Sequence, residues 1–141
     1  MQEIQYSSPH SIEEAVSILS AAGKGGRVLA GGTDLLVKLK NGAREIRHVV
    51  DIKRIAGLDS VQHLADGGLR IGAALSCARL GEDPVVRAIY PGLREAAMLI
   101  GSDQIQNRAT LAGNLCNASP AADTTPALMV LGASCEIQGP E

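Results

Sequence analysis

Short apolar runs alternate with helical patterns along the first third of the chain, and glycines stand at the junctions. Residues 4–6, 27–30 and 46–52 have the length and the partly β-branched composition of strands. Helical periodicity lies between them, over residues 12–19 and 35–39. Strands that alternate with helices in this way predict a fold of the α/β (α+β) class.

Local signals mark the ends of these elements. Ser11 and Glu14 have the spacing of a capping box, which predicts the start of the first helix. Glycines in residues 23–26 end that helix and turn the chain. The tight linker at residues 55–59 is the expected boundary between two small α/β subdomains, residues 1–55 and residues 56–141.

The second subdomain is expected to begin with a hairpin. Strands at residues 60–64 and 69–72 flank an Asp-Gly step that favours a tight turn. Further helices are expected over residues 76–80, 85–90, 93–100 and 123–131.

Two later segments bear on function and on domain organisation. Residues 102–122 mix small apolar residues with Gly, Asn, Ser, Asp and Gln, so we expect an ordered loop wrapped around a ligand. Residues 134–137 have the composition of a strand that begins just before the sequence stops. We therefore expect the second subdomain to be incomplete, and the sequence to be the amino-terminal part of a longer protein.

Composition excludes several classes of function. Thirteen basic and fifteen acidic residues give a net charge of −2 without a basic stripe, and aromatic residues make up 1%. Nucleic-acid binding through phosphate contacts or base stacking is therefore not expected. No apolar run has the length of a membrane span, and the amino terminus lacks the pattern of a signal peptide, so we expect a cytoplasmic location.

Side chains that could carry chemistry are scattered. The three cysteines form no C-x-x-C pair and the three histidines have no ligand-like spacing, so neither a disulfide framework nor a metal site is predicted. No catalytic constellation is recognisable, so no catalytic residue is predicted. We expect that any chemistry the chain serves belongs to a cofactor.

A first glycine-containing loop, Ala30 to Asp34, leaves an expected strand and enters an expected helix. Its paired glycines allow the backbone to approach a phosphate, and the first amides of the helix could donate to an anion. Thr33 adds a hydroxyl donor. A plain strand-to-helix turn explains the same residues, and the spacing matches neither the dinucleotide fingerprint nor the P-loop.

A second loop begins at Thr110 and contains Gly113 and Asn114. Thr110 and Asn114 offer neutral donors suited to a diphosphate, and the later Asp123 offers an acceptor for sugar or polyol hydroxyls. A helix N-cap is an equally good explanation of Asp123.

Four segments together resemble the FAD-binding (medium) subunit of the molybdenum hydroxylase and xanthine dehydrogenase family. They are residues 30–36, 71–73, 104–114 and 118–123. The resemblance implies two α/β subdomains of the PCMH-type FAD-binding fold, clasping an extended FAD. It implies an oxidoreductase subunit that receives electrons from iron–sulfur clusters and passes them through FAD to an acceptor. A large molybdopterin-binding subunit and a small subunit with [2Fe-2S] clusters are the partners that it implies.

The resemblance also implies particular cofactor contacts. The two loops hold the diphosphate, Ile100 and Gly101 lie on the adenine side, and Asp123 meets the ribityl or nearby hydroxyls. Cys116 either contacts the flavin or only fills space in the packing of the fold. The full set of expected cofactor-binding residues is Leu29, Ala30, Gly31, Gly32, Thr33, Asp34, Leu35, Ile100, Gly101, Ala109, Thr110, Gly113, Asn114, Cys116 and Asp123. The alternative is an α/β interaction module that keeps this fold without the cofactor.

Overall fold

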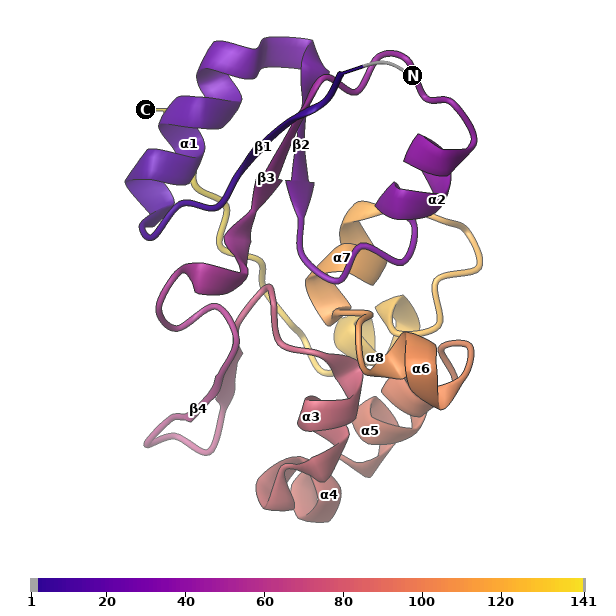
Figure 1. Cartoon of the computed structure of the whole chain (residues 1–141). Coiled ribbons are helices and arrows are strands. Elements are labelled where there is room, and N and C mark those ends of the chain that lie inside the picture. The colour runs from indigo at the N-terminus through magenta and orange to yellow at the C-terminus, as the bar shows by residue number, and fades with distance from the viewer. Residues whose placement is uncertain (1–2, 141) are drawn as a thin grey trace.

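A three-stranded parallel sheet organises the first part of the chain in the computed structural model, which describes residues 3–140 (Figure 1). Its strands are β1 (Gln5–Ser7), β2 (Gly26–Leu29) and β3 (His48–Asp51), in the order β1-β3-β2. Val49 of the central strand is in register with Tyr6 on one side and Arg27 on the other. The three predicted strands are thus present, although β3 is shorter than the apolar run 46–52.

Helices α1 (Ile12–Ala22) and α2 (Leu35–Lys40) pack on opposite faces of this sheet (Figure 1). Because side chains alternate along a strand, Val50 packs in the apolar cluster of α1 whereas Val49 packs in that of α2. The predicted N-terminus of α1 is confirmed, since the Ser11 hydroxyl accepts a hydrogen bond from the Glu14 amide at 3.1 Å. The sheet with its two helices matches the predicted α/β class.

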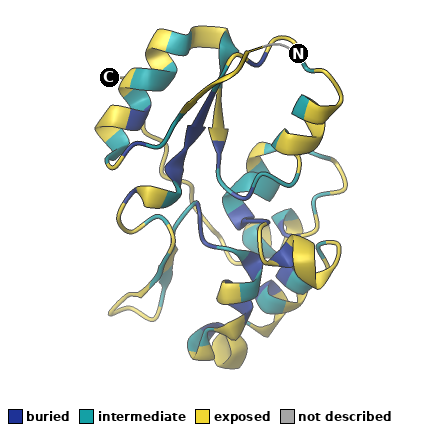
Figure 2. Cartoon of the chain, viewed as in Figure 1, coloured by how far each residue is buried: buried dark blue, intermediate teal, exposed yellow. Residues whose placement is uncertain are grey.

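The antiparallel hairpin predicted after the linker is present as β4 (Val61–His63) and β5 (Leu69–Ile71). Six helices follow it, namely α3 (Cys77–Glu82), α4 (Pro84–Ile89), α5 (Pro91–Met98), α6 (Asp103–Gln106), α7 (Leu111–Cys116) and α8 (Thr125–Val130). Short 3₁₀ turns, η1 (Gly23–Gly25) and η2 (Ile52–Arg54), follow α1 and β3. Figure 2 shows buried residues concentrated along β3 and among the helices of the second part.

The expected loop over residues 102–122 is wrong in its local structure, because the segment contains α6 and α7. Helix α7 begins where the Thr110 hydroxyl accepts a hydrogen bond from the Gly113 amide at 2.9 Å. Buried Leu111 anchors the first turn in the apolar cluster of α3 and α5. The polar composition of the segment therefore belongs to short capped helices.

Two further expectations differ from the structure. Residues 134–137 form no strand, because no strand among residues 3–140 pairs with them and Ile137 is 91% exposed. The residue at the N-cap of α8 is Thr124, not Asp123, so the N-cap explanation of Asp123 is also wrong.

Two kinds of feature are absent from residues 3–140. No helix there is long and apolar enough to cross a membrane, and no group of three His, Cys, Asp or Glu side chains could hold a metal ion. The division into subdomains at residue 55 stays a proposal. One apolar cluster, which contains Val50, Ile55 and Ala74, spans that position.

Candidate functional site

The two glycine-containing loops, about eighty residues apart in sequence, lie against one another and share a cleft of about 590 Å³. This volume falls in the usual range of small-molecule sites. Twelve of the fifteen expected cofactor-binding residues line it, namely Ala30, Gly31, Gly32, Thr33, Asp34, Leu35, Ile100, Ala109, Thr110, Gly113, Asn114 and Cys116. The structure therefore brings together the residues that the sequence grouped by motif.

At Gly31 the first loop lies so close to the backbone of residues 108–109 that no side chain fits there. A Cβ atom on Gly31 would overlap the Arg108 carbonyl, 2.7 Å from its carbon and 3.1 Å from the Cα of Ala109. The Arg108 side chain also donates from Nε to the Gly31 carbonyl oxygen at 3.4 Å. The sequence predicts that the paired glycines let a phosphate approach the backbone, whereas at Gly31 the absent side chain makes room for the Arg108 carbonyl just before the second loop.

Gly32 has a different structural reason to be glycine. Its φ angle is +85°, and a Cβ there would lie 2.8 Å from Cδ1 of Leu29. Leu29 is itself buried in the apolar cluster of Ile46 and Val49 and does not line the cleft. The side chain of Leu29 therefore supports the loop from beneath.

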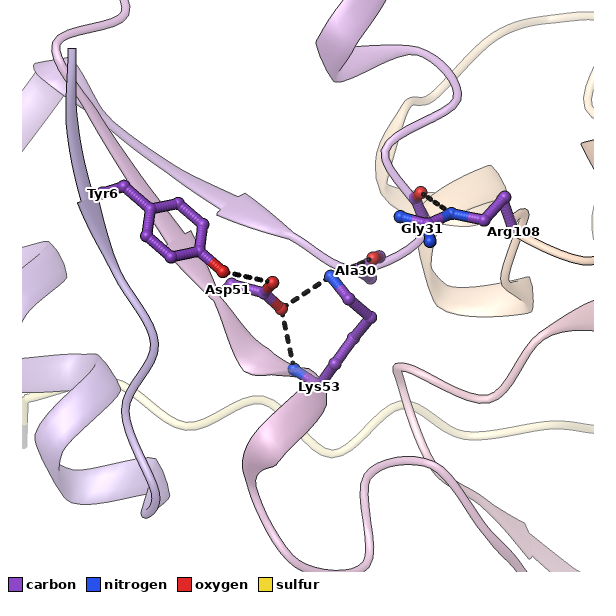
Figure 3. A network of polar contacts seen from close by, with 6 residues as sticks. All are labelled: Tyr6, Ala30, Gly31, Asp51, Lys53 and Arg108. Carbon is purple, nitrogen blue, oxygen red and sulfur yellow. Dashed lines mark hydrogen bonds and ion pairs between the residues drawn. The ribbon is translucent and has the colours of Figure 1, made fainter.

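A polar network at the end of the sheet holds the first loop in place (Figure 3). Nζ of Lys53 donates to the Ala30 carbonyl oxygen at 3.2 Å and to Oδ1 of Asp51 at 2.7 Å. The Tyr6 hydroxyl donates to Oδ2 of the same carboxylate at 2.7 Å. Through these contacts, the backbone carbonyls at positions 30 and 31 are bonded to Lys53 and Arg108, one from each part of the fold.

The network shifts the ionisation of two of its members. Burial raises the pKa of Asp51, but hydrogen bonds from Lys53 and Tyr6 outweigh burial and leave that pKa below its ordinary value. The pKa of Tyr6 is raised because its hydroxyl donates to the Asp51 carboxylate. Asp51 is therefore a carboxylate at neutral pH, and the network keeps its ionic contact with Lys53.

In the second loop, Asn114 is fixed through one half of its amide. Its Oδ1 accepts from the Thr124 hydroxyl at 2.6 Å and from the Thr124 amide at 3.3 Å. Thr124 is fully buried, so this anchor is firm. Within residues 3–140, Nδ2 of Asn114 has no hydrogen-bond partner, and Asn114 lines the cleft. The amide therefore has donors available to a ligand.

A second contact joins the loops through Asn117, the C-cap residue of α7. Its Oδ1 accepts from Nζ of Lys38 at 2.9 Å, and its Nδ2 donates to Oδ1 of Asp34 at 3.1 Å. All three residues line the cleft. The bridge therefore connects Asp34 and Lys38 of the first loop and α2 to the end of α7.

Helix dipoles contribute less to the electrostatics of the cleft than the sequence predicts. Helices α2 and α7 contain six residues each, and a short helix aligns few peptide dipoles. Asp34 also places a carboxylate at the N-cap of α2. An anion in this cleft would therefore depend mainly on individual donors and on cationic side chains.

Gly101 and Asp123, like Leu29, are not among the residues that line the cleft, and both are exposed. Eight residues outside the expected cofactor-binding set also line it: Arg27, Val28, Lys38, Glu45, Ile46, Ile52, Ala112 and Asn117. Helical spacing could have found two of them, because Lys38 lies four residues after Asp34 and Asn117 four after Gly113. The others depend on tertiary packing around β2 and β3.

The fold and the cleft define an α/β domain with a cofactor-sized site between two glycine-containing loops. Residues 2–141 match the family described as the FAD binding domain in molybdopterin dehydrogenase. The chain belongs to this family, and with it to the FAD-binding fold of the xanthine and carbon monoxide dehydrogenases that the sequence resemblance implied.

Curated relatives agree over nearly the whole chain. The xanthine dehydrogenase FAD-binding subunit of Escherichia coli O157:H7 is 36% identical over 135 residues, which are 96% of this chain and 46% of that protein. The carbon monoxide dehydrogenase medium chain of Hydrogenophaga pseudoflava is 33% identical over 136 residues, 96% of this chain and 47% of that one. The chain thus spans less than half the length of these two relatives.

Solved structures give the same result. A carbon monoxide dehydrogenase from Hydrogenophaga pseudoflava, lacking the Mo-pyranopterin moiety, matches with a TM-score of 0.80 at 35% identity, over 86% of this chain and 42% of that chain. Quinoline 2-oxidoreductase from Pseudomonas putida 86 matches with a TM-score of 0.78 at 29% identity, over 86% and 42%.

Proposed function

We propose that this chain binds FAD between its two glycine-containing loops and serves as the electron-transfer flavin part of a molybdenum-containing hydroxylase. One observation carries the proposal: Gly32 and Gly113, distant in sequence, line one cleft in a chain of this family. Relatives named as FAD-binding or medium subunits of xanthine and carbon monoxide dehydrogenases support it.

The residues present fit a dinucleotide. Gly32 and Gly113 line the cleft without side chains, so a ligand can approach their backbone. Asn114 offers its Nδ2 donors, and Thr33 offers a hydroxyl whose only described contact is with Asp34, at 3.5 Å. These neutral donors would hold the diphosphate. Ile100 and Ile52 would supply apolar contact to the rings.

In this proposal, the chain's own residues bind and orient the cofactor. Bound FAD would supply the redox chemistry, accepting electrons and passing them to an acceptor. Iron–sulfur clusters of a small subunit would deliver those electrons from a large molybdopterin-binding subunit. The cytoplasmic location expected from the sequence stays a prediction.

Cysteine labelling with and without FAD tests the proposed site in the full chain. Cys116 lines the cleft and is exposed, whereas exposed Cys135 does not line it and serves as an internal control. Burial raises the pKa of the Cys77 thiol to about 11, so Cys77 is expected to stay unlabelled while the chain is folded. We expect FAD to slow labelling of Cys116 and leave Cys135 unchanged.

The cofactor-free interaction module makes the opposite prediction. Equal labelling of Cys116 with and without FAD, together with no binding in a flavin-fluorescence titration, would contradict the flavin role and favour the module. Riboflavin in place of FAD is the matched ligand control, since it carries the ring system without the diphosphate.

A further inference from the structure

The charged residues of the cleft are not equivalent. Arg27 directs Nη1 to the backbone carbonyl oxygens of Lys24 and Gly26, at 2.8 and 2.7 Å, so this nitrogen of its guanidinium is held by the backbone around the start of β2. Lys38 instead donates to the side-chain amide oxygen of Asn117. Within residues 3–140, no carboxylate forms an ion pair with Lys38. Lys38 is therefore a cleft cation with a neutral partner.

Lys38 can exchange its hydrogen bond to Asn117 for one to an anion at a small cost in free energy. An amide oxygen carries only a partial charge, whereas an ionised oxygen forms a shorter and stronger hydrogen bond with an ammonium group. Asn117 would keep its second contact, from Nδ2 to Asp34, after losing Lys38. The Asp34 carboxylate accepts that bond on Oδ1, and its Oδ2 has only a long contact with the Thr33 hydroxyl, at 3.5 Å.

We infer that Lys38 is the cationic ligand of a diphosphate bound in this cleft, and that it makes the site favour dinucleotide flavins over riboflavin. This inference rests on the proposed function, because FAD brings the diphosphate to the cleft. The chemistry is that of a doubly charged anion whose other proposed ligand in the second loop, the Nδ2 group of Asn114, is a neutral donor. The short helices α2 and α7 leave that charge to be balanced by a side chain.

The test is a titration of the full chain with FAD and with riboflavin at low and high salt. Lys38→Met removes the charge and keeps most of the side-chain volume, whereas Lys38→Arg keeps the positive charge. Lys40→Met is the matched control. Lys40 is exposed on the same helix and does not line the cleft. Thermal unfolding of each variant checks that it is folded.

We expect Lys38→Met to raise the Kd for FAD about three- to tenfold at low salt, with a smaller effect at high salt. Riboflavin binding should be unchanged, Lys40→Met should match the wild type, and Lys38→Arg should recover most of the affinity. Equal FAD affinity of Lys38→Met and wild type overturns the inference and leaves the proposed function intact. An equal loss for FAD and riboflavin also overturns it, since the diphosphate is then not the partner.

A titration with inorganic pyrophosphate separates the proposed function from the anion site at Lys38. Binding is followed through the amide resonances of residues 31–34 and 113–114. If the wild type binds pyrophosphate through Lys38 but does not bind FAD, the proposed function fails and the anion site stands. If it binds neither, both fail.

Discussion

The backbone carbonyl of Arg108 occupies the space where a side chain on Gly31 would have to lie. This contact, between residues 77 positions apart in the sequence, packs the first glycine-containing loop against the backbone that leads into the second. Because both loops line the same cleft, its shape depends on the contact.

Gly31→Ala is therefore expected to separate the loops. The added methyl group must displace backbone, which costs about 1–3 kcal/mol and lowers the Tm by roughly 5 °C. FAD binding should weaken with it. Gly92→Ala is the control, because a Cβ on Gly92 meets nothing within 4 Å and the residue lies in α5. Thermal unfolding and FAD titration measure both effects, and a Gly31→Ala chain as stable as Gly92→Ala contradicts the loop contact.

Gly32 and Gly42 form a second matched pair. Their φ angles are +85° and +84°, so alanine costs about 1–2 kcal/mol in backbone strain at either position. At Gly42 the new methyl group meets nothing within 4 Å, whereas at Gly32 it would also press on Leu29. Urea unfolding should show Gly32→Ala to be less stable than Gly42→Ala by about 1 kcal/mol or more. Equal losses would mean that Leu29 does not support the loop.

Asn114→Asp is expected to separate ligand binding from stability. The carboxylate retains acceptors for the Thr124 hydroxyl and amide, so the Tm should stay close to that of the wild type. It replaces the Nδ2 donors of Asn114 with a negative charge facing the cleft. We expect the Kd for FAD to rise about tenfold or more, since the carboxylate would repel a diphosphate. Undiminished affinity would remove Asn114 from the site.

The Asp51 network predicts a particular pH dependence of stability. The pKa of Asp51 is lower in the folded chain than in the unfolded one, so the unfolded state binds the proton more tightly. The contribution of Asp51 to the free energy of unfolding is then fully present above about pH 4, the ordinary aspartate pKa. It is lost as the pH falls through the lower pKa of the folded chain. The stability advantage of the wild type over Asp51→Asn should be constant near neutrality and shrink in acid. An advantage that grows in acid would contradict this sign.

Local sequence signals predicted the elements with clear caps or clear periodicity. Ser11 with Glu14, and the Asp-Gly turn of the hairpin, each act over a few residues and therefore can be identified from the sequence. The expected strand at residues 134–137 failed because a strand requires a hydrogen-bonding neighbour, which composition does not reveal.

The candidate site likewise has features that the local sequence predicts and features that it does not. Both loops could be recognised because small residues and Thr-x-x-Gly spacing are local features of the sequence. The physical reason for Gly31 could not, since it depends on the Arg108 backbone from the other half of the chain. The bridge from Lys38 through Asn117 to Asp34 also joins residues about eighty positions apart. No local pattern encodes that distance.

Amide hydrogen exchange of the full chain, with and without saturating FAD, tests the central claim most directly. If one FAD lies between the two loops, exchange should slow together in residues 31–35 and in residues 110–117, while the hairpin β4–β5 stays unchanged. Protection of only one of the two segments, or of neither, would contradict a cofactor held between them.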